Sequence, residues 1–305
     1  MLSVISIGIG VKDFDYGALI NGNTDTWNIA VLSRIPRLVS ILVTGASLSI
    51  AGLIMQTITR NKFVSPSTAG TMEWCRLGIL IAIIMFGSES SMVRILVAFL
   101  VSLGGTLLFM KVLSKIQYKD SIMVPLIGMM MGNVVSSITT FFAYRYDIIQ
   151  NMSSWLQGNF SLIIKGNYEM LYLGIPFLFI ATLYAHHFTI AGMGESFSKN
   201  LGLNHERIVM IGLIIVSIVT SVVVVSVGSI AFVGLIIPNL ISMYKGDNIK
   251  STIFDTAMLG AIFILVCDMI GRGLIAPYEI PISVIVSVVG SILFLGIIFR
   301  RKQHG

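Results

Sequence analysis

Short polar segments divide the chain into a series of apolar runs, several of which are long enough to cross a lipid bilayer. The run from Leu38 to Thr59 holds no charged residue, and a hydrocarbon core of roughly 30 Å requires about 20 such residues in a helix. Comparable runs occupy about 68–87, 92–113, 122–143, 169–188, 208–227, 229–244, 253–271 and 280–299. Because lipid offers the backbone no hydrogen-bond partner, each run must form a helix. The pattern predicts an all-α polytopic membrane protein with a single transmembrane domain, 1–305.

Two places in this series depart from a regular crossing. The first apolar run, Leu2 to Val11, is only ten residues long, which is about 15 Å of helix and half a membrane. Either the start of the chain has been placed too late, or the first helix is truncated; counting it gives about ten transmembrane helices. Near Gly228 two runs almost merge, and a tight turn at Gly228-Ser229 is the simplest way to separate them.

Composition excludes several classes of protein. The chain is 55% hydrophobic and 11% charged, against about 25% charged in a typical soluble domain. The net charge of +6 is not gathered in a basic stripe, so it indicates cationic loops at a membrane face and no nucleic-acid partner. Cys75 and Cys267 stand in apolar runs without metal-ligand spacing. They are expected to be buried free thiols, and we expect no metal and no bound cofactor.

The distribution of basic residues predicts the orientation. If the N-terminus lies inside and the helices alternate, the inner segments hold twelve of the 20 lysines and arginines and the outer segments hold seven. This bias places both termini in the cytoplasm. Three arginines, Arg34, Arg37 and Arg272, then lie on the outer side against the general trend, and they require a separate explanation.

Two acidic residues inside apolar runs have a base one helical turn away. Glu73 precedes Arg76, and Asp268 precedes Arg272, so each pair shares a helix face. An unpaired charge in lipid costs several kcal/mol, so such residues form either a proton or ion relay or a structural ion pair between helices. With two pairs and no ladder of intramembrane histidines, structural ion pairs are favoured.

One run carries a cluster of flexible side chains. Met129, Met130 and Met131 lie between glycines and precede Asn133. Methionine is unbranched and polarizable, so it adapts to irregular surroundings. These residues either line a pathway for varied ligands or fill gaps in the helix bundle.

An ordered string of motifs resembles the permeases of ABC importers for iron-siderophores and vitamin B12. The string consists of Arg34/Pro36/Arg37, Gly45-Ala46…Gly52…Gln56, Arg60-Asn61…Pro66, Gly228-Ser229-Ile230-Ala231-Phe232-Val233-Gly234-Leu235-Ile236-Ile237-Pro238, and Gly260-Ala261…Asp268…Arg272…Glu279-Ile280-Pro281. The segment Asn61 to Val64 differs from the usual N-P-L-A and resembles Gram-positive permeases for catecholate-type siderophores. Asn239 stands where the family has histidine.

The resemblance implies a type II ABC-importer permease that translocates iron-siderophore complexes across the bacterial cytoplasmic membrane. Its partners would be a second permease subunit (the same or a related chain), two ATPase subunits and a substrate-binding lipoprotein, all in the lipid bilayer or docked on it. No G-x-x-x-x-G-K-[ST] phosphate loop occurs in the chain, so it is not expected to be an enzyme, and a partner would hydrolyse ATP. The alternative is a proton-coupled secondary transporter that uses Glu73 or Asp268.

The resemblance also assigns two contact regions. The segment that couples the permease to the ATPase would contain Gly192, Gly194, Glu195, Leu201, Gly202 and Leu203. On the outer side Arg34, Arg37 and Arg272 would receive acidic residues of the binding protein, since the planar guanidinium suits bidentate pairing with carboxylates. The alternative is internal pairing, with Arg272 held by Asp268 or Glu279 and the arginines anchoring helix ends.

Overall fold

Nearly every apolar run forms a helix in the computed structural model. The structure describes residues 2–9, 24–66, 70–87, 89–114, 123–161, 163–166, 168–275 and 277–302, and within these ranges no strand is present beyond isolated bridges. The helices are α1 Leu2–Gly8, α3 Thr24–Ile29, η1 Ala30–Arg34, α4 Ile35–Ile58, α5 Thr71–Phe86, α6 Ser91–Ser114, α7 Met123–Arg145, α8 Ile149–Leu156, η3 Glu169–Leu173, α9 Gly174–Leu183, α10 Ala185–Met193, α11 Glu195–Asn200, α12 His205–Val227, α13 Val233–Lys245, α14 Ile249–Gly273 and α15 Ile282–Lys302.

The predicted all-α membrane fold is confirmed. Among the described residues, five helices are long and apolar enough to cross a membrane alone, and η3–α9 with α10 adds a sixth span if this pair, bent by 60°, is one crossing. Shorter helices, α1, α5, α13 and α15, occupy the remaining predicted runs. The arrangement agrees with about ten membrane segments, several of which are incomplete crossings.

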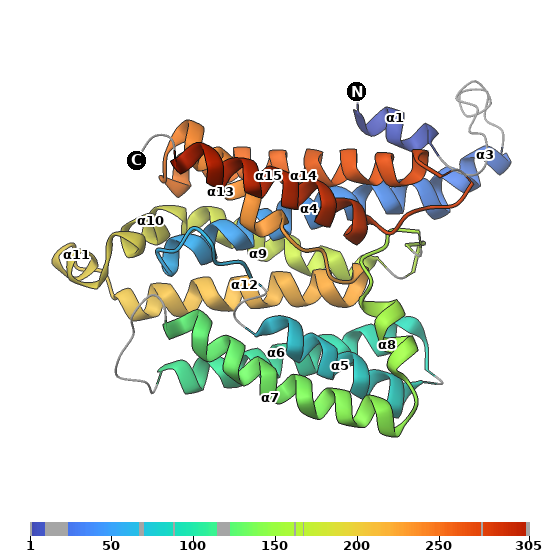
Figure 1. The fold of residues 1–305 in the computed structure, drawn as a ribbon, viewed down its shortest axis with the longest axis horizontal. Helices are drawn as coiled ribbons and strands as arrows, with labels where there is room; N and C mark the ends of the chain where they lie inside the picture. Colours follow the sequence, from blue (N-terminus) through green and yellow to red (C-terminus); the bar gives the residue numbers. More distant parts are fainter. Residues whose placement is uncertain are drawn as a thin grey trace.

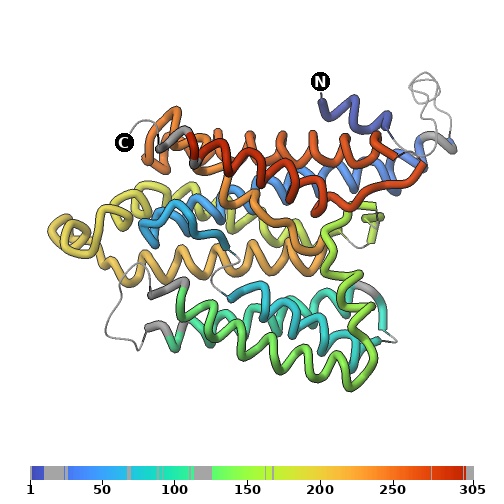
Figure 2. Tube along the Cα trace, viewed as in Figure 1, coloured from blue at the N-terminus to red at the C-terminus, as the bar shows by residue number. Residues whose placement is uncertain are grey.

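The helices lie along the long axis of the molecule in two groups with α12 between them (Figure 1). Helices α5, α6 and α7 pack on one side of α12, while α4, α13, α14 and α15 lie on the other. Figure 2 shows the blue α4 beside the orange α14. Their contact brings an early and a late part of the sequence together. We refer to the end of the bundle with Arg37 and α8 as the Arg37 end, and to the opposite end, with α11 and Lys245, as the Lys245 end.

Helix α4 is the central element because small residues let its neighbours approach closely. A methyl group at Gly45 would lie 2.5 Å from the carbonyl oxygen of Gly260 on α14, and one at Gly52 would lie 1.8 Å from that of Gly234 on α13. Ser49 fills the space between these contacts and is fully buried. In a membrane, where apolar side chains gain little by leaving lipid, such backbone contact is a main source of helix association.

The connection between α12 and α13 differs from the predicted tight turn at Gly228-Ser229. It spans residues 228–232, and it pairs with the segment after α8 instead of folding back on itself. The Ser229 N–H donates to the Leu156 carbonyl at 2.8 Å, and the Asn159 N–H donates to the Val227 carbonyl at 3.1 Å. In a two-residue turn, these backbone groups would have bonded to one another; here they bond to the segment after α8. The chain therefore runs on as an extended segment, and α13 begins inside the bundle.

The first helix is short, as the sequence predicted. Helix α1 has seven residues, roughly 10 Å of length, and it packs against α4 and α14. Its C-terminal side lies at the Arg37 end, where the Ile9 carbonyl accepts hydrogen bonds from Arg34 and Arg272. Lys12, Lys115 and Lys119, which entered the orientation argument, lie outside the described residues.

Candidate functional site

Four charged side chains form a buried cluster at the Arg37 end. Arg37 of α4 contacts Glu279 with Nη1–Oε2 at 2.8 Å and Asp268 of α14 with Nη2–Oδ1 at 2.8 Å. Arg272, one turn beyond Asp268, contacts the other oxygen of that carboxylate at 2.8 Å. Asp268 therefore lies between two arginines, and the two cations balance the two anions. This balance offsets the large cost of removing each charge from water.

The cluster also holds the first helix and the segment between α14 and α15. Arg272 donates to the Ser6 carbonyl at 2.8 Å and to the Ser6 hydroxyl at 2.6 Å, and the Ser161 hydroxyl donates to Glu279. Burial raises the pKa of Glu279, but the bonds from Ser161 and Arg37 outweigh it, so the pKa lies below its ordinary value. The segment that carries Glu279 is thereby fixed against α4.

The arginines predicted to dock a binding protein are distributed unequally between surface and interior. The side chains of Arg37 and Arg272 are 13% and 2% exposed and are engaged inside the protein. Arg34 is half-buried and donates to the Ile9 carbonyl. Arg272 pairs internally with Asp268, which is the alternative raised for it from the sequence. Arg37 also pairs internally, with Asp268 and Glu279. Docking of a partner on these residues stays a prediction.

Two interrupted crossings meet in the middle of the bundle. Loop 61–66 leads toward α5, segment 228–232 leads into α13, and the Pro66 ring contacts Gly234. The Gln56 amide donates to the carbonyls of Gly234 at 3.2 Å and Leu235 at 3.0 Å. Irregular backbone at membrane depth needs such partners, because lipid supplies none.

The hydrogen bonds of Asn239 show what an asparagine does at the position where the family has histidine. Its amide nitrogen donates to the Lys62 carbonyl at 2.7 Å and to the Leu235 carbonyl at 2.8 Å. The side chain thus fastens loop 61–66 to the first turn of α13. The amide provides two N–H donors with no need for protonation.

The segment predicted to couple to an ATPase forms a compact corner at the Lys245 end. It comprises the end of α10, helix α11 and the turn that follows, and it contains the predicted residues Gly192, Gly194, Glu195, Leu201, Gly202 and Leu203. Gly194 and Gly202 adopt positive φ values of 120° and 75°, which glycine reaches without steric cost. Phe197 and Leu201 expose their apolar side chains beside this corner.

The corner is packed against the end of α4. A methyl group at Gly192 would lie 2.5 Å from the Thr57 side chain, and one at Gly194 would lie 2.8 Å from the Arg60 guanidinium. The corner therefore contacts the end of α4, the helix on which α12, α13 and α14 pack. This contiguous path of packed residues can carry movement from the Lys245 end into the bundle.

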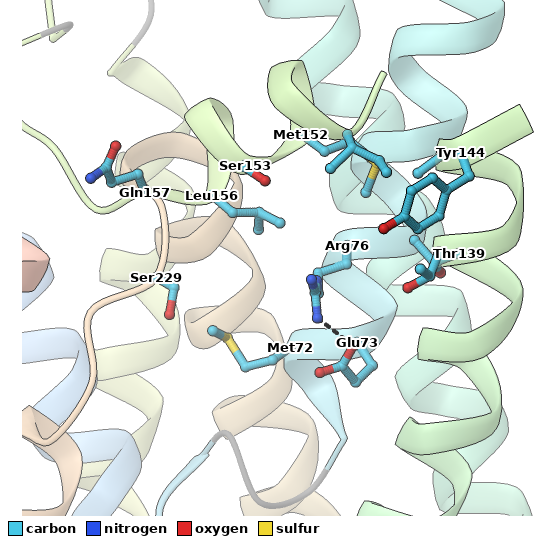
Figure 3. A pocket seen from close by; sticks show the side chains of 13 residues that line it. Met72, Glu73, Arg76, Thr139, Tyr144, Met152, Ser153, Leu156, Gln157 and Ser229 are labelled. Atoms are coloured by element: carbon cyan, nitrogen blue, oxygen red, sulfur yellow. Dashed lines mark hydrogen bonds and ion pairs between the residues drawn. The ribbon is translucent and has the colours of Figure 1, made fainter. Parts of the chain in front are cut away.

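A cavity of about 460 Å³ lies between α5, α7 and α8. Figure 3 shows Glu73 and Arg76 of α5 facing it across from Tyr144 of α7 and Ser153 of α8. The Glu73–Arg76 pair forms with an N–O distance of 3.3 Å. Because both residues belong to one helix, this pair does not connect α5 to a neighbour, unlike the Arg37–Asp268 pair, which joins α4 to α14.

The methionines predicted to line a pathway lie elsewhere on α7. Met129, Met130 and Asn133 are exposed, while Met131 packs partly against buried residues. None of the four lines the cavity, which begins two turns further along α7 at Thr139. The sequence offered one signal for the cavity, the charged pair in α5, and none for the contributions of α7 and α8.

The fold and these features define a polytopic permease with interrupted membrane helices and a compact corner at the Lys245 end. The profile of the FecCD transport family matches residues 1–300, and the chain belongs to this family. It is 55% identical over 304 residues to the petrobactin import system permease protein YclN of Bacillus subtilis (strain 168), covering 100% of this chain and 96% of that protein.

Two further likenesses agree with this assignment. The ferric-anguibactin transport system permease protein FatD of Vibrio anguillarum (strain ATCC 68554 / 775) is 38% identical over 302 residues, with 99% of this chain and 96% of that protein covered. A solved structure described as an inward-facing conformation of a metal-chelate type ABC transporter superposes with a TM-score of 0.87 at 25% identity. It covers 98% of this chain and 95% of that one. The predicted family and fold are confirmed.

Proposed function

We propose that the chain is the membrane-spanning permease subunit of an ABC importer that carries ferric siderophores across the cytoplasmic membrane. The observation that carries this proposal is the match along the whole chain to siderophore-import permeases, with 55% identity to a petrobactin permease. Ferric petrobactin is accordingly the first substrate to test. The catecholate subgroup suggested by residues 61–64 points to the same substrate class.

The partners follow from the same assignment. A second permease subunit completes the translocation unit, two ATPase subunits bind at the Lys245 end, and a substrate-binding lipoprotein docks at the Arg37 end. The exposed Phe197 and Leu201 support the ATPase contact, since apolar side chains at a water-facing corner gain from being covered. This arrangement places the Lys245 end and the C-terminal end of α15 in the cytoplasm (Figure 1).

The proposed mechanism is alternating access driven by ATP binding and hydrolysis in the partner. Movement of the ATPase displaces the corner at residues 192–203, which pushes on Thr57 and Arg60 and so shifts α4. The interrupted crossings at loop 61–66 and segment 228–232 are the places where helices can rearrange without breaking a continuous helix. The charge cluster at the Arg37 end holds α4 and α14 together during this movement.

Docking of the lipoprotein is proposed at the Arg37 end, with the half-buried Arg34 as the first contact residue. Arg37 and Arg272 fix the position of that surface through the charge cluster, and they would contact acidic residues of the lipoprotein directly only if the cluster opened. Arginine at such a contact pairs bidentately with carboxylates. Charge reversal at Arg34 therefore should reduce lipoprotein association more strongly at low salt than at high salt.

Uptake measurements in cells test the proposed function. The chain is expressed with its ATPase and lipoprotein in a strain lacking petrobactin import, and accumulation of radioactive iron from ferric petrobactin is followed. We expect uptake to stop when ATP is depleted with the membrane potential kept, and to persist when an uncoupler removes the potential with ATP kept. The reverse result would establish proton-coupled transport and overturn the proposal.

A further inference from the structure

The cavity between α5, α7 and α8 has a chemical character that the family assignment does not explain. Helix α5 is an interrupted crossing that starts inside the bundle, so Glu73 and Arg76 in its first two turns lie at membrane depth and not at a helix end near water (Figure 1). Contact with α7 confirms this depth, because the Glu73 side chain lies against Gly132, in the tenth position of that 23-residue helix. From there the cavity extends to Ile149, Met152 and Ser153 of α8 at the Arg37 end.

The exposure of the two charges excludes lipid as their surroundings. The Arg76 side chain is 44% exposed and that of Glu73 is 26% exposed. Charged residues at membrane depth face the interior of a bundle or a water-filled space, because contact with acyl chains is costly. Both side chains belong to the lining of the cavity, as Figure 3 shows. The cavity is therefore an aqueous pocket at membrane depth, between α5, α7 and α8.

Arg76 retains most of its hydrogen-bonding capacity in this pocket. The guanidinium has five N–H donors, and among the described residues the one acceptor it contacts is Glu73, through a single bond of 3.3 Å. The opposite wall carries the hydroxyls of Tyr144 and Ser153, for which no hydrogen bond is seen within the part of the chain that the structure describes. A cation with free donors and neutral hydroxyls on the facing wall match a ligand with anionic oxygens.

We propose that this pocket is a binding site for the anionic oxygen groups, carboxylate or catecholate, of the ferric chelate as it passes through the permease. Arg76 binds the anion, the hydroxyls of Ser153 and Tyr144 donate hydrogen bonds to it, and Glu73 is the partner that Arg76 exchanges for the ligand. This inference rests on the proposed function and adds to it the residue that contacts the substrate. A volume of 460 Å³ lies within the range of ligand sites and receives one arm of a large chelate.

Cysteine labelling tests the charge preference of the pocket without any need for transport. Both native cysteines are buried, with exposures of 0% and 1%, so Ser153→Cys supplies the reactive thiol in the otherwise intact protein. The reagents are an anionic and a cationic methanethiosulfonate of similar size, applied from outside to membrane vesicles. We expect the ratio of anionic to cationic labelling rates to fall at least threefold when Arg76→Gln is added. Ser90→Cys, exposed and remote from the pocket, serves as the control and should show no such change.

Transport by the complete complex gives the second arm. Arg76→Gln is expected to lower uptake of ferric petrobactin at least tenfold while lipoprotein-stimulated ATP hydrolysis is kept, and Arg76→Lys is expected to retain part of the uptake. Arg145→Gln, at an exposed arginine on the same side of the molecule, should transport normally. An unchanged labelling ratio, or normal uptake by Arg76→Gln in an active complex, would overturn the proposed site. Absence of uptake in every variant including the unaltered protein would instead count against the proposed function, and the labelling ratio would still decide the site.

Discussion

Glycine at a few positions decides whether the helices of this permease can meet. The Gly52 Cα faces the Gly234 carbonyl so closely that an added methyl group would lie 1.8 Å from it, and the obstacle is backbone that cannot rotate away. We expect Gly52→Ala to destabilise the protein by about 1–3 kcal/mol, the range for overpacking, or to prevent its insertion as a folded bundle. Gly104→Ala on α6 is the matched control, since no atom of the described residues lies within 4 Å of the added methyl group. It should stabilise by about 0.5–1 kcal/mol. Thermal unfolding in detergent compares the two, and equal midpoints would contradict the packing argument.

The charge cluster makes a second prediction at the scale of residues. Arg37→Gln removes the partner of Glu279 and one of the two partners of Asp268, whose side chain is 3% exposed. Breaking a buried ion pair from one side costs about 3–5 kcal/mol, and a large fall in the unfolding midpoint is expected. The double variant Arg37→Gln/Glu279→Gln restores the charge balance and should recover part of the loss. Arg145→Gln, at an exposed site, provides the reference, and a loss no larger than this reference would refute the stabilising role.

Acid should reveal the contribution of Glu279. Its pKa in the folded protein lies below the ordinary value of 4.5 because the bonds from Ser161 and Arg37 outweigh the effect of burial. The unfolded chain therefore binds more protons than the folded chain just below pH 4.5, and the stability that Glu279 confers is present above this pH and lost as pH falls through the folded pKa. The difference in unfolding midpoint between the unaltered protein and Glu279→Gln should shrink from pH 7 to pH 3.5. A difference that stays constant with pH would show that the Glu279 carboxylate is not the source of this stability.

At the scale of helices, the sequence predicted elements well where a run of apolar residues forms one unbroken helix. Helix α4 agrees with the run at 38–59 because charges bound that run on both sides. The interrupted crossings were not predicted, since α5 and α13 begin inside the bundle and their flanking segments remain apolar. At the start of α13, distant hydrogen bonds from Gln56 to Gly234 and from Ser229 to Leu156 hold backbone groups of the interruption. Such contacts between distant residues cannot be predicted from hydropathy along the chain.

The corner at residues 192–203 gives a prediction at the scale of a single helix and its turn. Glu195 and Gly202 lie in α11 and in the turn after it, and they are exposed, with no described atom within 4 Å of a methyl group added at Gly202. Gly202→Ala introduces strain of roughly 1–2 kcal/mol, because φ is 75° there. It is therefore expected to alter the corner without unfolding the bundle. Transport should fall while ATP hydrolysis by the partner continues, and Glu195→Gln should act in the same direction. Crosslinks from residue 197 to the ATPase are the direct check, and a crosslink that forms only from the loop between α6 and α7 would assign coupling to that loop instead.

The whole molecule joins residues that the sequence keeps far apart, and this limits how much of the site could be predicted. Arg37 is separated by 231 residues from Asp268 and by 242 from Glu279. The Asp268–Arg272 pair was predictable because its spacing is one helical turn, whereas the second arginine on Asp268 required the packing of α4 against α14. The same holds for the cavity. Its charged wall follows from the spacing of Glu73 and Arg76, but its hydroxyl wall depends on how α7 and α8 fold against α5.

Orientation in the membrane is the property of the whole molecule that carries the remaining proposals. The corner at residues 192–203 and the C-terminal end of α15 lie at one end of the bundle, and α8 lies at the other (Figure 1). The side of the membrane assigned to one of these three segments therefore fixes the side of the other two. The excess of lysine and arginine predicts that the corner and α15 lie inside. Tags after Lys302 and within residues 192–203 should report the cytoplasm, and a tag within residues 150–167 should report the outside. An impermeant label that reaches a C-terminal tag in intact cells would reverse the orientation. The ATPase contact at the corner and the lipoprotein contact at Arg34 would then both be wrong, whereas the charge cluster and the cavity, which depend on internal contacts alone, would stand.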